Sequence, residues 1–101
     1  MSPFDVFIAY VSWHDGGKRR PILIQQKNTK YTKAFRITTK FDSKSTQIKA
    51  RYFEINDWKQ AGLAKQSYID TMKSIEVPTN YISSQIGRLS ESDIRRLLEF
   101  I

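Results

Sequence analysis

The sequence contains no cysteine and only one histidine, His14. Disulfide bonds, thiolate zinc sites and cysteine nucleophiles are therefore excluded, and so is a metal site built from several histidines. Apolar runs extend over only a few residues, far short of the roughly 20 that a membrane-spanning helix needs. The first residues carry neither a basic n-region nor a small-residue cleavage site. We therefore expect a cytoplasmic protein with no membrane partner.

Two common kinds of phosphate and metal site are also missing from the sequence. The chain has no glycine-rich phosphate-binding loop, and it has no carboxylate cluster of the kind that holds magnesium. We therefore expect neither a metal ion nor a cofactor.

Acidic side chains are scarce in the first half of the chain. Residues 1–50 hold ten basic and three acidic side chains, an excess of seven, whereas residues 51–101 hold seven of each. The whole formal net charge of +7 therefore lies in the first half. A localised positive field favours a polyanionic partner, and nucleic acid is the commonest one.

What is present suffices for one small folded domain. The chain has 101 residues, of which 40% are hydrophobic and 13% aromatic, so we expect a single domain over residues 1–101. β-Branched and alternating apolar runs predict strands at 6–13, 22–25, 34–39, 46–55 and 68–77. Turn composition marks 14–17 and 42–45, residues 27–33 form a polar loop, and residues 82–89 fit either a strand or irregular chain.

Helical signals are confined to the second half of the chain. Asn56 is a suitable N-cap for a short turn over 57–60 that ends at Gly62. Ser90 and Asp93 resemble a capping box, and apolar residues at 94, 97, 98 and 101 predict an amphipathic terminal helix. We expect a mostly antiparallel, barrel-like β domain with this helix docked on it.

The densest charge cluster precedes a proline. Lys18, Arg19 and Arg20 are consecutive, and Pro21 restricts the backbone of the residue before it. Three adjacent cations repel one another unless an anion compensates them, and a guanidinium binds phosphate in a bidentate manner. The same residues also fit a solvated basic turn.

Other candidate binding residues carry weaker signals. Thr38, Thr39 and Lys40 end the third predicted strand, where hydroxyl groups can donate to phosphate, although threonine is common in any strand. His14 titrates near neutral pH and is a candidate acid or base, but a solvated histidine on a turn fits equally well. Lysines from 27 to 49 alternate with aromatic residues that either stack on bases or belong to the core.

A phosphodiester bond in RNA can be cut without a metal ion. The adjacent 2′-hydroxyl is the nucleophile, so the protein only positions the strand, stabilises the charge at phosphorus and assists proton transfer. An arginine and a hydroxyl group, with or without a histidine, suffice for this. DNA lacks the 2′-hydroxyl, so such a site is specific for RNA.

Four segments follow one another at a characteristic spacing: GGKRRPILI (16–24), ITTK (37–40), AGLAKQSYI (61–69) and IGRLSESDIRRLL (86–98). Together they resemble the MazF/PemK toxins, the ribonucleases of bacterial type II toxin–antitoxin systems. The resemblance implies a small SH3-like antiparallel β-barrel with a C-terminal helix, and a homodimer. It also implies metal-independent cleavage of single-stranded RNA to a 2′,3′-cyclic phosphate and a 5′-hydroxyl.

The resemblance implies particular roles for two residues. The arginine before the proline, Arg20, corresponds to the catalytic arginine, and Thr38 best matches the catalytic threonine. Lys18, Arg19, Thr39, Lys40 and His14 are expected to bind substrate. A cognate antitoxin with an acidic segment is expected to compete for the same surface. Two alternatives remain: a gyrase-binding toxin of the related CcdB type, and an RNA-binding barrel without catalysis.

Overall fold

The computed structural model describes the backbone of residues 1–13 and 16–101, and the side chains of these residues other than 12 and 13. The elements of this described part are β1 (Asp5–Trp13), β2 (Gly16–Gln26), β3 (Tyr31–Thr38), α1 (Thr46–Lys49), β4 (Tyr52–Glu54), β5 (Tyr68–Pro78), the 3₁₀ turn η1 (Thr79–Tyr81), β6 (Ile82–Arg88) and α2 (Glu91–Phe100). None of its helices is long and apolar enough to cross a membrane.

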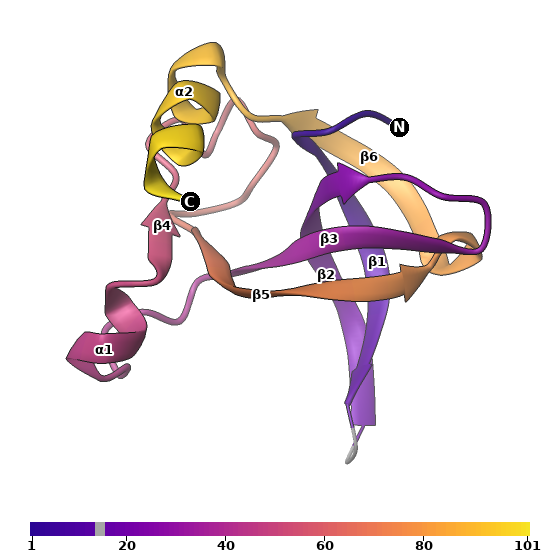
Figure 1. Cartoon of the computed structure of the whole chain (residues 1–101), viewed down its shortest axis with the longest axis horizontal. Coiled ribbons are helices and arrows are strands. Elements are labelled where there is room, and N and C mark those ends of the chain that lie inside the picture. Colours follow the sequence, from indigo (N-terminus) through magenta and orange to yellow (C-terminus); the bar gives the residue numbers. More distant parts are fainter. Residues whose placement is uncertain (14–15) are drawn as a thin grey trace.

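The described strands form one antiparallel sheet in the order β4-β5-β3-β2-β1-β6. Figure 1 shows β3 and β5 running across the long β1–β2 hairpin, so the sheet is strongly coiled. Its hydrogen bonds leave β4 and β6 as edges, and the expected barrel is therefore an open, curved sheet. The prediction of a mainly antiparallel β fold with a C-terminal helix is confirmed.

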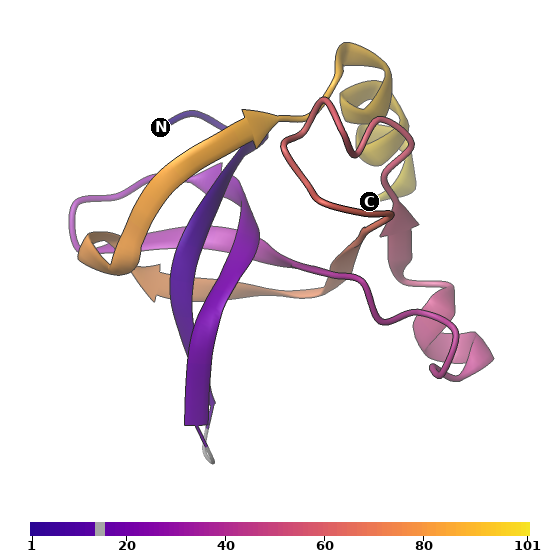
Figure 2. The same cartoon turned by 180° about the vertical axis from the view of Figure 1, so that it is seen from behind.

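Strand alternation separates the side chains of β2 and β3 into two faces. The odd-numbered apolar residues of β2 and β3, Leu23, Phe35 and Ile37, belong to a larger core with residues of β1, β4, β5, α2 and the adjoining turns: Val6, Phe53, Ile55, Ala61, Leu63, Ile69, Leu89 and Leu97. The even-numbered apolar residues, Ile22, Ile24 and Ala34, belong to a smaller core with Ala9 and Val11 of β1 and Val77 of β5. We call the first the covered face, because Leu97 and Ile94 of α2 pack against it, and the second the open face. Figure 2 shows α2 at one corner of the sheet, next to β4.

The C-terminal helix α2 begins at the predicted cap. Ser90 Oγ accepts a hydrogen bond from the backbone N–H of Asp93 (3.1 Å). The Asp93 side chain is fully buried and accepts from the backbone N–H groups of Asn56 (3.3 Å) and Asp57 (2.8 Å). It also pairs with Arg96 (2.7 Å). These five residues form a clasp that fixes α2 to the turn after β4.

The apolar residues of α2 are not equally buried. Leu97 is 1% exposed and Ile94 is half-buried, whereas Leu98 and Ile101 are 55% and 60% exposed. The helix therefore packs through the side that carries Asp93 and Leu97, and a residue one position further on is rotated by about 100° away from the sheet. The predicted stripe is correct for its first two residues only.

The prediction of one strand over residues 46–55 is wrong. These residues form the short helix α1 and then β4. Ser45 Oγ accepts from the backbone N–H of Ile48 (3.3 Å), which is an N-cap, and this cap starts a helix in a segment whose apolar residues alternate. The internal α-helix thus lies before β4, whereas the segment expected to be helical, residues 57–60, lies within a turn that ends at Gly62 with φ +85°.

The second strand is longer than expected. It begins at Gly16, so both glycines of the predicted turn lie in β2, and Pro21 lies within the strand rather than at its start. The ladder to β3 begins only at Ile22, so Pro21 pairs with β1 alone, and a proline is tolerated at such an edge. The third strand begins at Tyr31 instead of residue 34, and residues 82–88 form the strand β6.

Candidate active site

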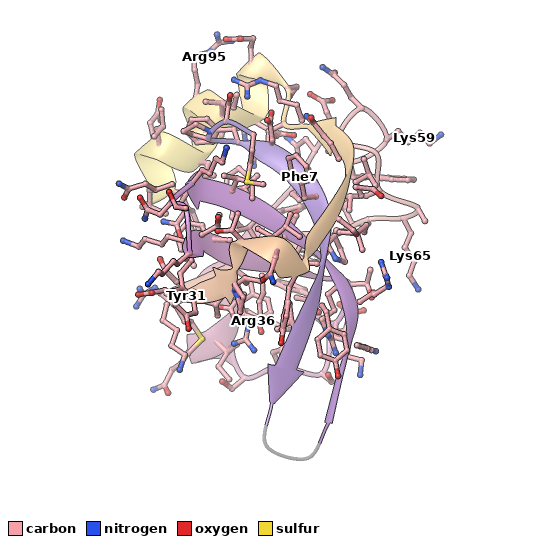
Figure 3. The ribbon with its side chains drawn as sticks, turned by 90° about the vertical axis from the view of Figure 1, so that its right-hand side faces the viewer. Phe7, Tyr31, Arg36, Lys59, Lys65 and Arg95 are labelled. Carbon is pink, nitrogen blue, oxygen red and sulfur yellow. The ribbon has the colours of Figure 1, made fainter. Side chains whose placement is uncertain are left out.

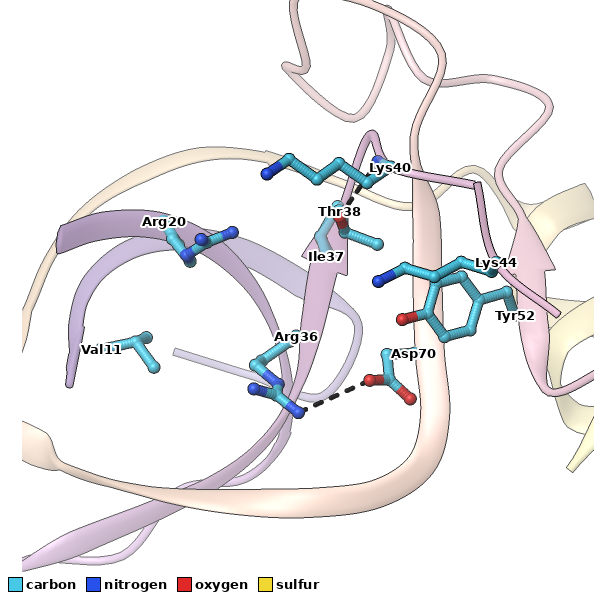
Figure 4. Close-up of a pocket in the computed structure, with 9 residues that line it drawn as sticks. All are labelled: Val11, Arg20, Arg36, Ile37, Thr38, Lys40, Lys44, Tyr52 and Asp70. Atoms are coloured by element: carbon cyan, nitrogen blue, oxygen red, sulfur yellow. Dashed lines mark hydrogen bonds and ion pairs between the residues drawn. The ribbon is translucent and has the colours of Figure 1, made fainter. Parts of the chain in front are cut away.

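A cavity of about 330 Å³ opens on the open face, beyond the smaller core. It lies where β1, β2, β3, β4, β5 and the loop after β3 meet (Figure 4). Its lining residues are Val11, Arg20, Arg36, Ile37, Thr38, Lys40, Lys44, Tyr52 and Asp70. We call it the candidate site.

Arg20 and Thr38 meet in this cavity because of the β2–β3 register. Ile22 pairs with Arg36 and Ile24 with Ala34, and continuing this register by two residues places Arg20 opposite Thr38. Both residues have the even parity of the open face. Two residues that are 18 positions apart in the sequence therefore line the same cavity.

The hydroxyl group of Thr38 is oriented by the chain that follows it. Thr38 Oγ1 accepts from the backbone N–H of Lys40 at 3.1 Å, which closes a small turn at the end of β3. Within the described residues this hydroxyl donates to no protein group, so its hydrogen is available to an acceptor in the cavity.

Positive charge dominates the lining of the cavity. Among the lining residues that the structure describes, Arg20, Arg36, Lys40 and Lys44 face one carboxylate, that of Asp70, which leaves a formal excess of three positive charges. Arg36 Nη2 and Asp70 Oδ2 lie 3.6 Å apart. Such a cavity suits an oxyanion such as a phosphate group.

Tyr52 contributes a neutral hydroxyl to the cavity wall. Burial raises the pKa of the Tyr52 phenol above 10.0, the negative charge of Asp70 raises it further, and Arg36 opposes both. At neutral pH the group is therefore a hydrogen-bond donor. Burial likewise raises the pKa of Tyr68, with Glu54 and Asp42 adding to the effect.

Aromatic contacts hold the loop after β3 against the sheet. The rings of Phe41 and Tyr68 are stacked, with centroids 4.2 Å apart and an interplanar angle of 8°. Lys49 Nζ lies 5.1 Å from the centroid of the Phe41 ring. Lys40 and Lys44 lie on either side of Phe41 in the sequence, and both line the cavity.

Of the four predicted substrate-binding residues that the structure describes, Lys40 alone lines the cavity. Thr39 is exposed at a bend after β3, and Lys18 is exposed on β2 with the parity of Arg20. Arg19 has the opposite parity and donates from Nη1 to Ser83 Oγ (3.3 Å) on β6. His14 lies outside the described residues. The roles of these residues stay predictions.

Four polar lining residues were not predicted as site residues from the sequence: Arg36, Lys44, Tyr52 and Asp70. Arg36 precedes Thr38 by two residues on one strand, so alternation alone assigns both to the same face. Asp70 lies in a strand that also carries Lys73 and Glu76, so it does not stand out in the sequence. Lys44 and Tyr52 line the cavity because of how residues 39–54 pack, and no local sequence pattern specifies this packing.

Not all basic residues gather at this cavity. Figure 3 shows Lys59, Lys65 and Arg95 projecting outward, while Arg36 lies within the outline of the strands.

Among the described residues, no group of three or more His, Cys, Asp or Glu side chains is placed to hold a metal ion.

Comparison with known proteins identifies the fold. No protein-family model matches the chain, and no curated protein matches it in sequence. Among solved structures, the Mycobacterium tuberculosis toxin MazF-mt6 is similar to it with a TM-score of 0.70 and 24% sequence identity, over 96% of this chain and 91% of that chain. The chain therefore has the fold of a MazF toxin, as the resemblance in the sequence implies.

Proposed function

We propose that this chain is the toxin of a type II toxin–antitoxin pair and an endoribonuclease that cleaves single-stranded RNA in the candidate site. The observation that carries the proposal is the meeting of Arg20 and Thr38, from two strands, in a cavity with a marked excess of positive charge. The fold shared with MazF-mt6 supports it.

The proposed reaction uses the RNA, this chain and water. The 2′-oxygen attacks phosphorus, the bond from phosphorus to the 5′-oxygen breaks, and the products are a 2′,3′-cyclic phosphate and a 5′-hydroxyl. Water takes up the proton that the 2′-hydroxyl loses and supplies the proton that the leaving 5′-oxygen gains, so the protons balance. Arg20 stabilises the extra negative charge at phosphorus, and Thr38 donates a hydrogen bond to a phosphate oxygen.

Further parts of the basic surface would hold the RNA strand. Lys40 reaches the cavity itself, and Lys18 and Thr39 extend the basic surface along β2 and beyond the end of β3, whereas Arg19 would meet the RNA from the other face of β2, beside β6. His14 is the candidate for an additional acid or base. Each contact between a cation and a phosphate releases counterions, so binding should weaken steeply with salt.

The proposal includes two protein partners. An antitoxin with an acidic segment would occupy the same cations and exclude RNA by competition. A second copy of the chain would form a homodimer, which buries additional surface in a protein this small. Such a toxin acts on RNA in the cytoplasm.

Incubation of the purified protein with a long single-stranded RNA in EDTA tests the activity. We expect discrete fragments with 5′-hydroxyl ends. Retarded but intact RNA would favour the binding protein without catalysis. If RNA is neither bound nor cut while DNA gyrase is bound, the CcdB-type alternative is correct.

Two variants test the assigned residues. Arg20→Ala should lower the cleavage rate by about 10²–10³, the cost of one donor to the transition state, with RNA binding retained. Thr38→Val keeps the side-chain shape without the hydroxyl and should also slow cleavage. Arg95→Ala, which removes an exposed arginine from α2, is the control and should cleave like the parent. Equal rates for Thr38→Val and the parent would refute the role of Thr38.

A further inference from the structure

A second arginine occupies the candidate site. Arg36 lies two residues before Thr38 on the open face of β3. It lines the candidate site and also a neighbouring cavity of about 580 Å³ bounded by β5 and η1. Its guanidinium therefore stands where the two cavities meet, next to the residues proposed to act at the phosphate.

Asp70 restrains this arginine from the adjacent strand. Arg36 and Asp70 are cross-strand partners in the β3–β5 ladder, and Tyr52 of β4 is the partner of Asp70 on its other side. The carboxylate is itself fixed, because Asp70 Oδ1 accepts from the backbone N–H of Met72 (2.9 Å) and only 11% of the side chain is exposed.

The pairing leaves most of the guanidinium available. The ion pair joins one nitrogen, Nη2, to one carboxylate oxygen at 3.6 Å, and 40% of the Arg36 side chain is exposed. A guanidinium carries five N–H donors in a planar fork, so the remaining donors can bind an oxyanion while Asp70 holds the group in place. Figure 4 shows Arg36 between Arg20 and Asp70.

On the basis of the proposed ribonuclease function, we propose that Arg36 is a second phosphate-binding arginine and that Asp70 is the residue that positions it. Among the described lining residues, the carboxylate of Asp70 faces four cations and weakens the attraction for RNA, so its benefit lies in geometry. An arginine restrained by Asp70 keeps the orientation in which its guanidinium meets the phosphate during the reaction. Arg36 and Arg20 would then hold the phosphate from two sides.

A second ion pair in the chain provides matched controls. Arg88 and Asp5 lie 3.0 Å apart at the opposite end of β1, and their side chains are 48% and 9% exposed. Arg88→Gln and Asp5→Asn therefore remove the same chemical groups from a similar environment away from the candidate site. Thermal unfolding of each variant establishes that the molecules compared are folded.

Binding of a probe that cannot be cleaved tests Arg36. The probe is a single-stranded 2′-O-methyl RNA of 15 nucleotides with randomised sequence, and its dissociation constant is measured from 50 to 200 mM salt. Arg36→Gln should reduce the slope of log K against log salt by about 0.7, the value for one phosphate contact on a single strand. Arg88→Gln should leave the slope unchanged. An unchanged slope in Arg36→Gln would overturn the proposal.

Cleavage kinetics test Asp70. Asp70→Asn should bind the probe at least as tightly as the parent, because a negative charge is removed, yet kcat should fall by about 10- to 100-fold as Arg36 loses its position. Arg36→Lys keeps the charge without the fork and should retain the salt slope but lose kcat. A purely structural role would instead weaken binding and cleavage together, and Asp5→Asn should change neither.

The two proposals fail in different ways. If the parent binds the probe but cuts no RNA, the ribonuclease function fails, while the salt slope still decides the role of Arg36. If the parent cuts RNA and Arg36→Gln matches it in slope and kcat, the role of Arg36 is refuted and the ribonuclease function stands. A parent that neither binds nor cuts RNA refutes both.

Discussion

Alternation along β2 and β3 produces two faces of opposite character, one packed and apolar and the other positively charged. On the covered face, apolar side chains pack under α2, and the polar groups of the clasp satisfy one another. On the open face the apolar core is small, and beyond it four cations crowd one cavity. The covered face thus contributes most of the free energy of unfolding. Repulsion between the cations of the open face lowers that free energy, but it keeps positive charges together in one cavity.

The clasp offers the largest test of this contrast. Asp93→Ala removes the acceptor of two backbone N–H groups and leaves Arg96 without its carboxylate. The free energy of unfolding should fall by about 3–5 kcal/mol, as when one partner of a buried pair is deleted. Urea denaturation measures it.

Glu91→Ala is the control for the clasp. Glu91 is exposed in the first turn of the same helix, so its loss should cost less than about 1 kcal/mol through the helix dipole. If both variants lose the same stability, the buried clasp is not what holds α2.

A pair of adjacent leucines tests which side of α2 is covered. Leu97→Ala empties a fully buried position and should lower the free energy of unfolding by about 2–5 kcal/mol. Leu98→Ala removes the same atoms from a side chain that is 55% exposed, and should cost under about 1 kcal/mol. Equal losses in urea denaturation would mean that the helix packs through a different side.

Removing a positive charge from the open face should raise the free energy of unfolding, in contrast to the substitutions on the covered face. Lys44→Gln relieves repulsion with the other cations of the cavity and should raise the free energy of unfolding by about 0.3–0.5 kcal/mol at low salt. The gain should disappear in 1 M salt, where the Debye length is about 3 Å. Lys59→Gln, which projects outward, should show no such gain (Figure 3). A loss of stability in Lys44→Gln would contradict the contrast between the faces.

Local signals in the sequence predict the elements that have local causes. The cap at Ser90 and the apolar run of β1 are such cases, and both are present in the structure. Residues 46–55 defeat the prediction because two local signals conflict: alternation favours a strand, and the Ser45 cap favours a helix. The extent of β2 is also missed, because Pro21 is tolerated only where the ladder to β3 has not begun.

The candidate site likewise contains residues that the sequence indicates and residues that depend on how the strands pair. The blocks around Arg20 and Thr38 indicate two lining residues, and the strand register explains why they meet. Asp70 enters the cavity because a bulge in β5 shifts the pairing between Ala34 and Arg36. A shift of register depends on how strands pair in space, so no periodicity in the sequence could reveal it.

The smallest effect concerns the row of residues that joins β3, β5 and β4. Because burial and the charge of Asp70 raise the pKa of Tyr52, its phenol should ionise above pH 10 in the parent. Asp70→Asn removes one cause, so the Tyr52 pKa should fall toward 10, whereas Asp5→Asn should not affect it. Because the Tyr52 pKa is higher in the folded than in the unfolded state, the protonated phenol contributes to the free energy of unfolding. This contribution is fully present below pH 10 and is lost as the pH rises through the folded pKa. Ultraviolet titration of the tyrosines, with Tyr52→Phe to assign the signal, measures the shift, and an unchanged Tyr52 titration in Asp70→Asn would mean that the carboxylate does not act on the cavity wall.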